Sequence, residues 1–403
     1  MKFFLRFLPY RDLWFISNVR WLILARFFAN ITFYSTLMVP FQTSRGLNFT
    51  EMFSLESIIS LFSWAFDIPT GIWADRFGYR RVLTTGYGLN VASLLVFILA
   101  HTFWMFALAS ALFGIGLACI SGCESALVYE SLPRENDFAS LGTSAFSLLN
   151  AATPAGFLLG LSFGSFLGAY NLLLPFIASI LPMALAFLAT FRLQPVIFQQ
   201  RQERIQPAFH RLRIIDILRS ALHIVREQPT AIGLSLLQSA GFALIDSIFW
   251  YNQPYFARAG IAVVWFGPIT AVAVGLGIIV ALTAPGAKQR LGTSNALALS
   301  CLVPAIGYTA LSLIRIPALT ALFVALVAAG PGWRQPIIVD ELNRRIKGGP
   351  RATTLSVLSS IGTLVGIALN PLIGGAGDLG SGITGLSLGA GLAVLGLMVK
   401  VLL

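Results

Sequence analysis

Long apolar windows follow one another along the whole chain, and short stretches rich in charge and turn residues separate them. A helix needs about 20 mostly apolar residues to cross a bilayer. The windows that approach this length predict transmembrane helices at roughly 19–41, 52–73, 82–100, 104–129, 141–168, 171–192, 230–256, 262–284, 293–314, 317–339, 353–376 and 382–402. The pattern predicts an all-α integral membrane protein of twelve spans, with tight turns near residues 101–103 and 169–170.

The composition supports a lipid environment. The chain is 57% hydrophobic and only 11% charged, whereas an ordinary soluble domain has about 25% charged residues. The 37 glycines suit close helix contacts in membranes. Arg6, Arg11 and Asp12 interrupt the N-terminal apolar residues, so we expect a basic, aromatic surface segment there, not a signal peptide.

The longest polar segment divides the spans into six and six. It occupies residues 193–229, between an N-terminal six-helix bundle at 1–192 and a C-terminal one at 230–403. Its second half alternates apolar and basic residues at helical spacing, which favours an amphipathic helix on the inner membrane surface. A regulatory or partner-binding site is the alternative.

The two halves resemble each other weakly. A shift of 214 positions places Arg76-Phe77-Gly78 on Arg290-Leu291-Gly292 and Pro40 on Pro254, at equivalent ends of equivalent spans. Repeats of helices are a usual way to build alternating access. We therefore expect two pseudo-symmetric six-helix bundles.

The basic residues fall mostly on one side of the expected membrane. With the N-terminus in the cytoplasm, 21 of the 27 Lys and Arg residues lie inside, and three, Arg45, Arg258 and Arg315, lie outside. This bias predicts cytoplasmic N- and C-termini. The net charge of +11 then reflects topology, and no exposed aromatic and basic domain suggests nucleic-acid binding. A compact chain without targeting segments suggests the inner membrane of a bacterium.

Residues 67–83 read DIPTGIWADRFGYRRVL and concentrate charge between the second and third spans. They resemble the signature loop of the major facilitator superfamily, G-x-x-x-D-R-x-G-R-R, although Tyr79 departs from it. The matching positions are Gly71, Asp75, Arg76, Gly78, Arg80 and Arg81, and Asp67 opens the motif as in bacterial members. With the twelve spans and the central basic segment, the resemblance covers the whole chain.

The resemblance implies a gate on the cytoplasmic side. Asp75 is expected to face the positive end of the eleventh span and so to latch the two halves when the cavity opens outward. Gly71 and Gly78 suit tight turns and close helix approach. Arg80 and Arg81 either join the latch or only fix the topology.

Two further patterns bear on the place of the chain in the family. Residues 121–132, SGCESALVYESL, resemble a pattern at the end of the fourth span in many bacterial members. The exporter hallmark G-x-x-x-G-P-x-x-G-G is missing from the fifth span, which instead has glycines at every fourth position, and a near match falls in the eleventh span at residues 366–375. Export is therefore open to question.

Ionisable groups inside spans are costly, so each is a candidate functional residue. Arg26, Asn30 and Tyr34 recur every fourth residue, which predicts one shared face of the first span. Arg26 and Glu124 lie at similar depth in spans that line the cavity in the family, so we expect them to pair or to share a water. The alternative is that Arg26 extends to the inner surface.

The second half has its own candidates. Helical spacing places Gln238, Asp246 and Trp250 on one face of the seventh span with several aromatic residues. A carboxylate there suits a cationic or amphipathic ligand or carries a proton, and a structural hydrogen bond is the alternative. Arg334 lies among prolines and glycines of the tenth span, suited to an anionic substrate group or to a carboxylate such as Glu124.

These residues favour a secondary transporter of a small amphipathic molecule, coupled to protons and exporting a drug or metabolite. Nutrient uptake is the first alternative, and a lipid flippase is a weaker one. No phosphate-binding Gly-rich loop and no cluster of catalytic residues is present, so we expect neither an enzyme nor a cofactor. Cys119 and Cys123 are four residues apart, but without a nearby His they read as small core residues, not as a metal site. We expect a monomer.

Overall fold

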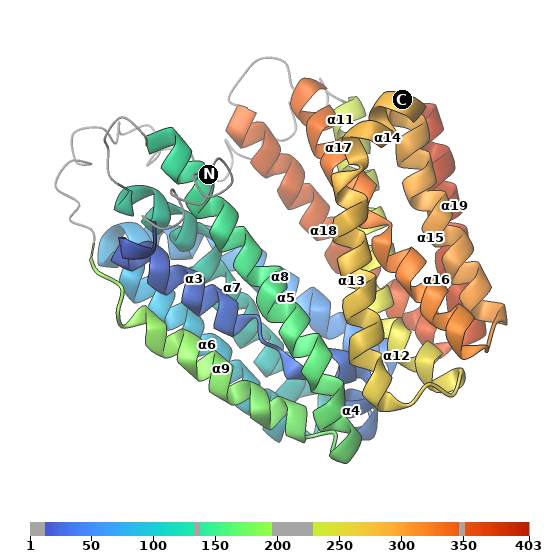
Figure 1. Ribbon diagram of the computed structural model, residues 1–403, viewed down its shortest axis with the longest axis horizontal. Coiled ribbons are helices and arrows are strands. Elements are labelled where there is room, and N and C mark those ends of the chain that lie inside the picture. The colour runs from blue at the N-terminus through green and yellow to red at the C-terminus, as the bar shows by residue number, and fades with distance from the viewer. Residues whose placement is uncertain (1–12, 133–137, 196–228, 346–350, 403) are drawn as a thin grey trace, which may run out of the picture. The chain divides into compact units, whose positions relative to one another are not determined.

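The computed structural model describes residues 13–132, 138–195, 229–345 and 351–402, and all regular structure in these ranges is helical (Figure 1). The first half contains α3 (Ser17–Ala29), the 3-10 helix η1 (Phe33–Leu37), α4 (Met38–Ser44), α5 (Phe49–Phe77), α6 (Tyr79–Leu99), α7 (Phe103–Ser131), α8 (Phe138–Tyr170) and α9 (Leu174–Thr190). The second half contains α11 (Pro229–Asp246), α12 (Ile248–Arg258), the 3-10 helix η3 (Val263–Trp265), α13 (Phe266–Leu282), α14 (Ala284–Leu291), α15 (Thr293–Leu313), α16 (Pro317–Ala329), α17 (Pro331–Arg345), α18 (Arg351–Asp378) and α19 (Ser381–Leu402). The expected amphipathic helix of segment 193–229 falls almost wholly outside the described residues.

These helices make the twelve expected spans. Ten helical segments of the described chain are long and apolar enough to cross a membrane. The other two spans are α9, which is apolar but has only 17 residues, and α5, which is 29 residues long and carries several charges. The protein is therefore an all-helical, multi-pass membrane protein. The two expected tight turns are present at Ala100–Thr102 and Asn171–Leu173.

The helices group into two compact units. Unit 1 comprises Met1–Leu47, Ile58–Val196 and Val263–Pro268, and unit 2 comprises Asn48–Ser57, Ile197–Ala262 and Ile269–Leu403. The start of α5 belongs to unit 2 because Asp378 of α18 accepts hydrogen bonds from the backbone N–H groups of Phe49 and Thr50, at 2.7 and 3.1 Å. Because residues 48–57 belong to unit 2 and residues 263–268 belong to unit 1, a single boundary at 193–229 does not reproduce the two units.

The internal repeat extends well beyond the two matches found in the sequence. Moving the bounds of α6 by 214 positions reproduces the bounds of α15, and moving those of α7 reproduces the first and last residues of α16 and α17 together. Gly46 and Gly78, with φ of 86° and 88°, correspond to Gly260 and Gly292, with φ of 75° and 78°. Only glycine adopts such φ values readily, so the same turns recur in both halves.

Three of the expected spans, at 19–41, 230–256 and 317–339, contain irregular backbone. The first span leaves α-helical geometry after Ala29, the seventh is interrupted at Ser247, and the tenth is interrupted at Gly330. All three segments are still long and apolar enough to cross a membrane. Apolar periodicity alone does not locate such irregularities, although the prolines and glycines of the tenth span lie beside its interruption.

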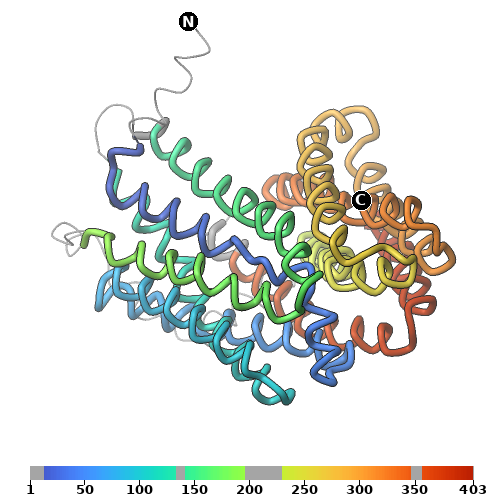
Figure 2. Tube along the Cα trace, turned by 60° about the horizontal axis from the view of Figure 1, so that its bottom comes forward, coloured from blue at the N-terminus to red at the C-terminus, as the bar shows by residue number. Residues whose placement is uncertain are grey.

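The glycines of α8 explain how the break in the first span is held. A methyl group added at Gly156 or Gly164 would overlap the carbonyl oxygen of Phe27 or Phe33. Gly160 lies against the backbone of Thr32 in the same way, whereas Gly168 lies against the side chain of Leu37. The glycine series therefore lets α8 lie directly on the backbone of residues 27–33, and Figure 2 shows α8 beside α3.

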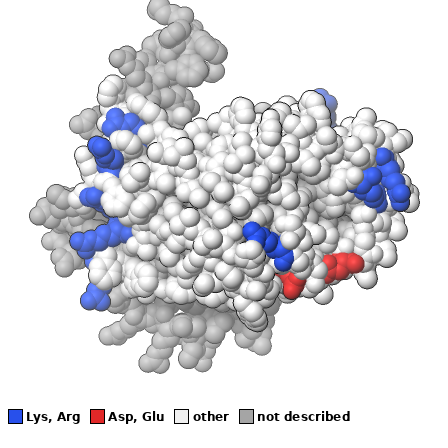
Figure 3. Space-filling view, turned by 90° about the horizontal axis from the view of Figure 1, so that it is seen from below, with Lys and Arg blue, Asp and Glu red and all other residues white. Residues whose placement is uncertain are grey.

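Large apolar side chains face outward along the helices, including Leu181 and Leu282, which are 67% and 78% exposed. The face in Figure 3 is mostly uncharged, with Lys and Arg gathered near its two ends and a further basic group beside acidic side chains near its middle. Such a surface is suited to lipid, because apolar side chains are not excluded from a hydrocarbon solvent as they are from water.

Replacing Gly164 with Ala tests the contact between α8 and the first span. We expect a loss of about 1–3 kcal/mol, because backbone cannot move aside as a flexible side chain can. The midpoint of thermal unfolding in detergent measures the effect. Gly122→Ala in α7 is the matched control, since no atom lies within 4 Å of the added methyl group. Equal midpoints for the two variants would contradict the contact.

Candidate functional site

A buried ion pair joins two spans of unit 1. Arg26, near the end of α3, places Nη1 3.3 Å from Oε2 of Glu124 on α7. Glu124 is only 4% exposed, while the side chain of Arg26 is 30% exposed. The pairing expected from the sequence is therefore present in the structure. Its role in transport stays a prediction.

Two residues that the sequence did not suggest complete this group. The hydroxyl of Tyr87 on α6 donates a hydrogen bond to Oε1 of Glu124 at 2.7 Å. Nε of Arg26 donates to Oγ1 of Thr153 on α8 at 2.8 Å. Both carboxylate oxygens of Glu124 are thus engaged, as a buried charge requires. Tyr87 and Thr153 carry no signal in the sequence, because only the packing of α6 and α8 against α3 and α7 brings them close.

Asn30 and Tyr34 do not share a helical face with Arg26, so that prediction was wrong. The α-helix ends at Ala29, and the side chain of Asn30 turns back to donate to the carbonyl oxygen of Arg26 at 2.7 Å. Tyr34 lies in η1 and stacks on Phe176 of α9, with ring centroids 5.2 Å apart. Asn30 fixes the end of α3, and Tyr34 is half-buried against α9.

Unit 2 contains a second group of charges beside two interrupted spans. Asp246 is the last residue of α11, and Arg334 lies in the first turn of α17. Arg334 is 1% exposed, and its charge interacts with that of Asp246. Glu56 of α5 also interacts electrostatically with Asp246. Glu56 belongs to this group because the start of α5, residues 48–57, is part of unit 2.

The seventh span passes from α11 to α12 at Ser247, which keeps α-helical dihedral angles (φ −56°, ψ −16°). On α11, Gln238 bonds to Gln335 of α17 through their side-chain amides. On α12, Trp250 lies beside Phe53, with ring centroids 5.8 Å apart. The shared face of Gln238, Asp246 and Trp250 stays a prediction.

The signature segment is almost entirely helical. Helix α5 continues to Phe77, a single residue, Gly78, makes the turn with φ of 88°, and α6 begins at Tyr79. The expected loop of several residues was wrong, because a glycine with positive φ reverses the chain in one step. Asp67 lies within α5, where the hydroxyl of Ser121 donates to it at 3.5 Å.

The remaining signature residues lie on the surface around this turn. Asp75 is exposed, the guanidinium of Arg76 lies 5.5 Å from the ring centroid of Phe77, and Arg80 donates to the carbonyl oxygen of Phe191 at 2.9 Å. A methyl group at Gly71 would meet no atom within 4 Å. Close helix approach at Gly71, which the motif suggested, is therefore not found among the described residues.

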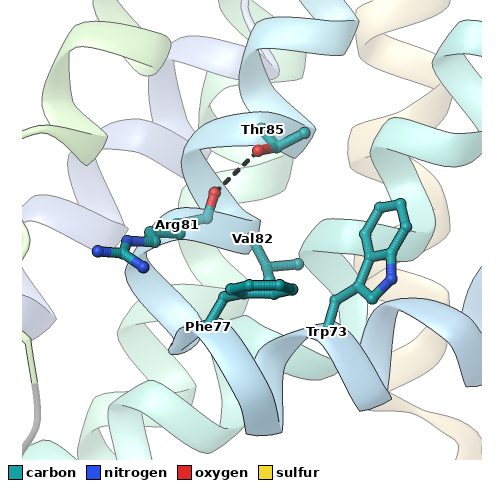
Figure 4. Close-up of a pocket in the computed structure, with 5 residues that line it drawn as sticks. All are labelled: Trp73, Phe77, Arg81, Val82 and Thr85. Carbon is teal, nitrogen blue, oxygen red and sulfur yellow. Dashed lines mark hydrogen bonds between the residues drawn. The ribbon is translucent and has the colours of Figure 1, made fainter.

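A pocket of about 260 Å³ lies beside the turn, between α5 and α6, and is lined by Trp73, Phe77, Arg81, Val82 and Thr85. Figure 4 shows Phe77 and Val82 close together, while Arg81 points away from Trp73. Trp73 and Phe77 are 45% and 49% exposed. Exposed aromatic rings next to arginines at the end of a span are typical of the membrane–water interface.

The cysteines form no site of their own. Cys119, Cys123 and Cys301 are buried free thiols. Within the part of the chain that the structure describes, no group of three or more His, Cys, Asp or Glu side chains is arranged to hold a metal ion.

A family model described as the Major Facilitator Superfamily matches residues 20–371, most of the 403-residue chain. A search of curated protein sequences gives no match.

Solved structures share the whole fold. The nucleoside transporter NupG aligns with a TM-score of 0.79 over 96% of this chain and 99% of its own length, at 14% sequence identity. A mutant of the peptide transporter POT aligns with a TM-score of 0.69 over 95% of this chain and 93% of its own, at 15% identity. At such low identity the likeness establishes the fold alone.

Replacing Arg26 with Met tests whether the unit 1 group is held by charge. We expect a loss of about 1–3 kcal/mol in stability, because Glu124 is left buried without its cation; the partial exposure of Arg26 places this below the cost for a fully buried pair. Adding Glu124→Gln should restore most of the loss, measured as the unfolding midpoint in detergent. A double variant no more stable than Arg26→Met would argue against the pair.

Proposed function

Because the chain belongs to the Major Facilitator Superfamily, we propose that it is a secondary transporter that moves a small amphipathic molecule by alternating access and couples this movement to protons. The observation that carries the proposal is the position of Glu124, a buried carboxylate held by Arg26 and Tyr87 in the last third of the membrane-spanning helix α7. Intramembrane carboxylates that face the interior of a bundle mark proton and substrate pathways.

Glu124 has two arrangements that suit a proton carrier. When charged, it pairs with Arg26 and accepts the hydrogen bond from Tyr87. When protonated, it has no charge to hold Arg26, which then retains Thr153 as its partner. Arrival and departure of a proton therefore change which side chains bind Arg26, and such a change can bias one conformation over another.

The direction that we propose to test first is export by exchange with protons. Uptake together with protons is the second candidate. Two observations favour it: the G-P-x-x-G-G core is missing from α8, and transporters of nucleosides and peptides share the fold.

For the setting of the protein we propose the bacterial inner membrane, with both termini in the cytoplasm and a monomer as the working unit. The bias of Lys and Arg towards one side supports this orientation. For the signature residues we keep the gating role that the motif implies, with Asp75 as its acceptor of hydrogen bonds. Asp75 lies exposed near the end of α5.

Glu124→Gln tests the coupling. We expect proton-driven transport to fall by more than about tenfold, because an amide cannot carry a proton, while exchange of substrate without a gradient continues. Proteoliposomes with an imposed pH gradient measure both, with uridine, a dipeptide and the dye ethidium as probes. Inverted vesicles separate the directions, since export appears there as accumulation driven by an acidic interior.

Glu130→Gln is the matched control, since it removes a less buried carboxylate from the same helix. Wild-type, gradient-driven flux in Glu124→Gln would contradict the coupling role. Scrambling of labelled phospholipid, without movement of any solute probe, would instead identify a lipid flippase.

A further inference from the structure

Arg334 is a buried cation without a direct partner. Its side chain is among the largest that are fully buried, at 1% exposure. None of its three guanidinium nitrogens has a hydrogen-bond partner among the described residues. Asp246 interacts with it electrostatically but does not come within the 4.0 Å of an ion pair. A buried guanidinium left in this condition is costly.

The equivalent spans of unit 1 show what a completed arrangement looks like. There Arg26 has a carboxylate oxygen at 3.3 Å and a hydroxyl at 2.8 Å, although it is the more exposed of the two arginines. Both units therefore place an arginine and a carboxylate on the same pair of repeated spans, the first and fourth or the seventh and tenth. Of these two arginines, only Arg334 lacks an oxygen of a described residue at hydrogen-bonding distance. Arg334 is also the more buried of the two, so its charge costs more free energy to leave without a partner.

The guanidinium of Arg334 lies against α11. Gly241 of that helix is so close to Nη1 that a methyl group there would overlap it. The next residue of α17, Gln335, is exposed and joins α17 to α11 through its bond with Gln238. Gln238 Oε1 is itself buried and accepts no hydrogen bond from a described residue. Arg334 is thus next in sequence to a polar contact between the two helices and lies within one turn of the helix interruption at Gly330.

We propose that Arg334 binds an oxyanion group, a carboxylate or a phosphate, of the transported molecule. This inference rests on the proposed function and names its substrate class. A guanidinium offers a planar fork of N–H donors that matches both oxyanions with two parallel hydrogen bonds. Asp246 is too far away to occupy this fork and balances the charge until the oxyanion arrives. The transported molecule is therefore an organic anion or a zwitterion.

The first measurement is the unfolding midpoint of the purified full-length protein in detergent, titrated with sodium benzoate, inorganic phosphate or choline chloride at constant ionic strength. A ligand that binds only the folded state raises the midpoint with concentration. We expect benzoate or phosphate to do so and choline not to. A rise with benzoate indicates a carboxylate site, and a rise with phosphate indicates a phosphate site. A rise with choline alone, or no rise with either anion, would overturn the inference.

Variants then test whether the rise of the unfolding midpoint with anions depends on Arg334. Arg334→Met should abolish it and should destabilise the ligand-free protein less than Arg26→Met does, because Arg334 makes no hydrogen bond to a described residue that could be lost. If Arg334 only stabilised the fold, Arg334→Met would keep the anion response and lose stability. Gly241→Ala keeps the charge but displaces the guanidinium, which is the flexible end of its side chain, so we expect anion affinity to fall by about tenfold while the fold is kept.

Arg258 supplies the matched control. It lies in the same unit and donates to the hydroxyl of Ser381 at 2.9 Å and to the carbonyl oxygens of Ser312 and Ile314 at 3.3 and 3.1 Å. Arg258→Met should therefore destabilise the protein and leave the anion response intact. If Arg334→Met behaves like Arg258→Met, both losing stability and keeping the response, the inference is wrong.

The failure of this inference differs from the failure of the proposed function. Proton-driven transport of a neutral or cationic probe that persists in Arg334→Met would refute the oxyanion site and leave the transporter in place. Anion stabilisation that depends on Arg334, without transport of any probe under a pH gradient, would keep the site and refute proton-coupled transport.

Discussion

The hydrocarbon interior of a bilayer supplies no hydrogen bonds, so a chain that crosses it must satisfy its polar groups by itself. This constraint accounts for the all-helical structure and also for the form of its irregularities. Where the first span leaves the α-helix, the N–H of Phe33 donates to the hydroxyl of Ser179 at 3.0 Å. Where the seventh span is interrupted, Ser247 and Tyr308 both donate to the carbonyl oxygen of Leu244, at 2.7 and 3.1 Å. Each break is possible because a neighbouring side chain replaces the missing backbone bond.

The same constraint makes the distribution of charge informative. The internal repeat is close enough that helix bounds and positive-φ glycines recur 214 residues apart, yet the charges do not follow it. Unit 1 has its arginine on the first span and its carboxylate on the fourth, whereas unit 2 has its carboxylate on the seventh span and its arginine on the tenth. Symmetric folding needs no such reversal. The two units therefore hold their charges differently: Arg26 is paired with Glu124, whereas Arg334 has no hydrogen-bond partner among the described residues.

Much of the fold could be predicted from the sequence, because apolar windows of span length and the bias of basic residues are strong, additive signals. The pairing of Arg26 with Glu124 could be anticipated as well, since both lie inside apolar windows where a charge needs a partner. Tyr87, Thr153 and Glu56 could not, because their roles depend on which helices pack side by side. The helical face assigned to Tyr34 failed for a different reason: Tyr34 lies in η1, beyond the end of α3, and periodicity carries no information about where the backbone leaves the α-helix.

The breaks and the charges lie next to each other, and this proximity has a mechanical consequence. Asn30 ends α3 by bonding to the carbonyl oxygen of Arg26, one turn before the backbone becomes irregular. Asp246 and Arg334 likewise lie within a turn of the interruptions at Ser247 and Gly330. A charge in the middle of an unbroken helix moves only with the whole helix, since the hydrogen-bond ladder holds it on both sides. A charge at the end of a helical segment is held on one side only, so a change of its partner is expected to shift a short segment and the helices packed against it.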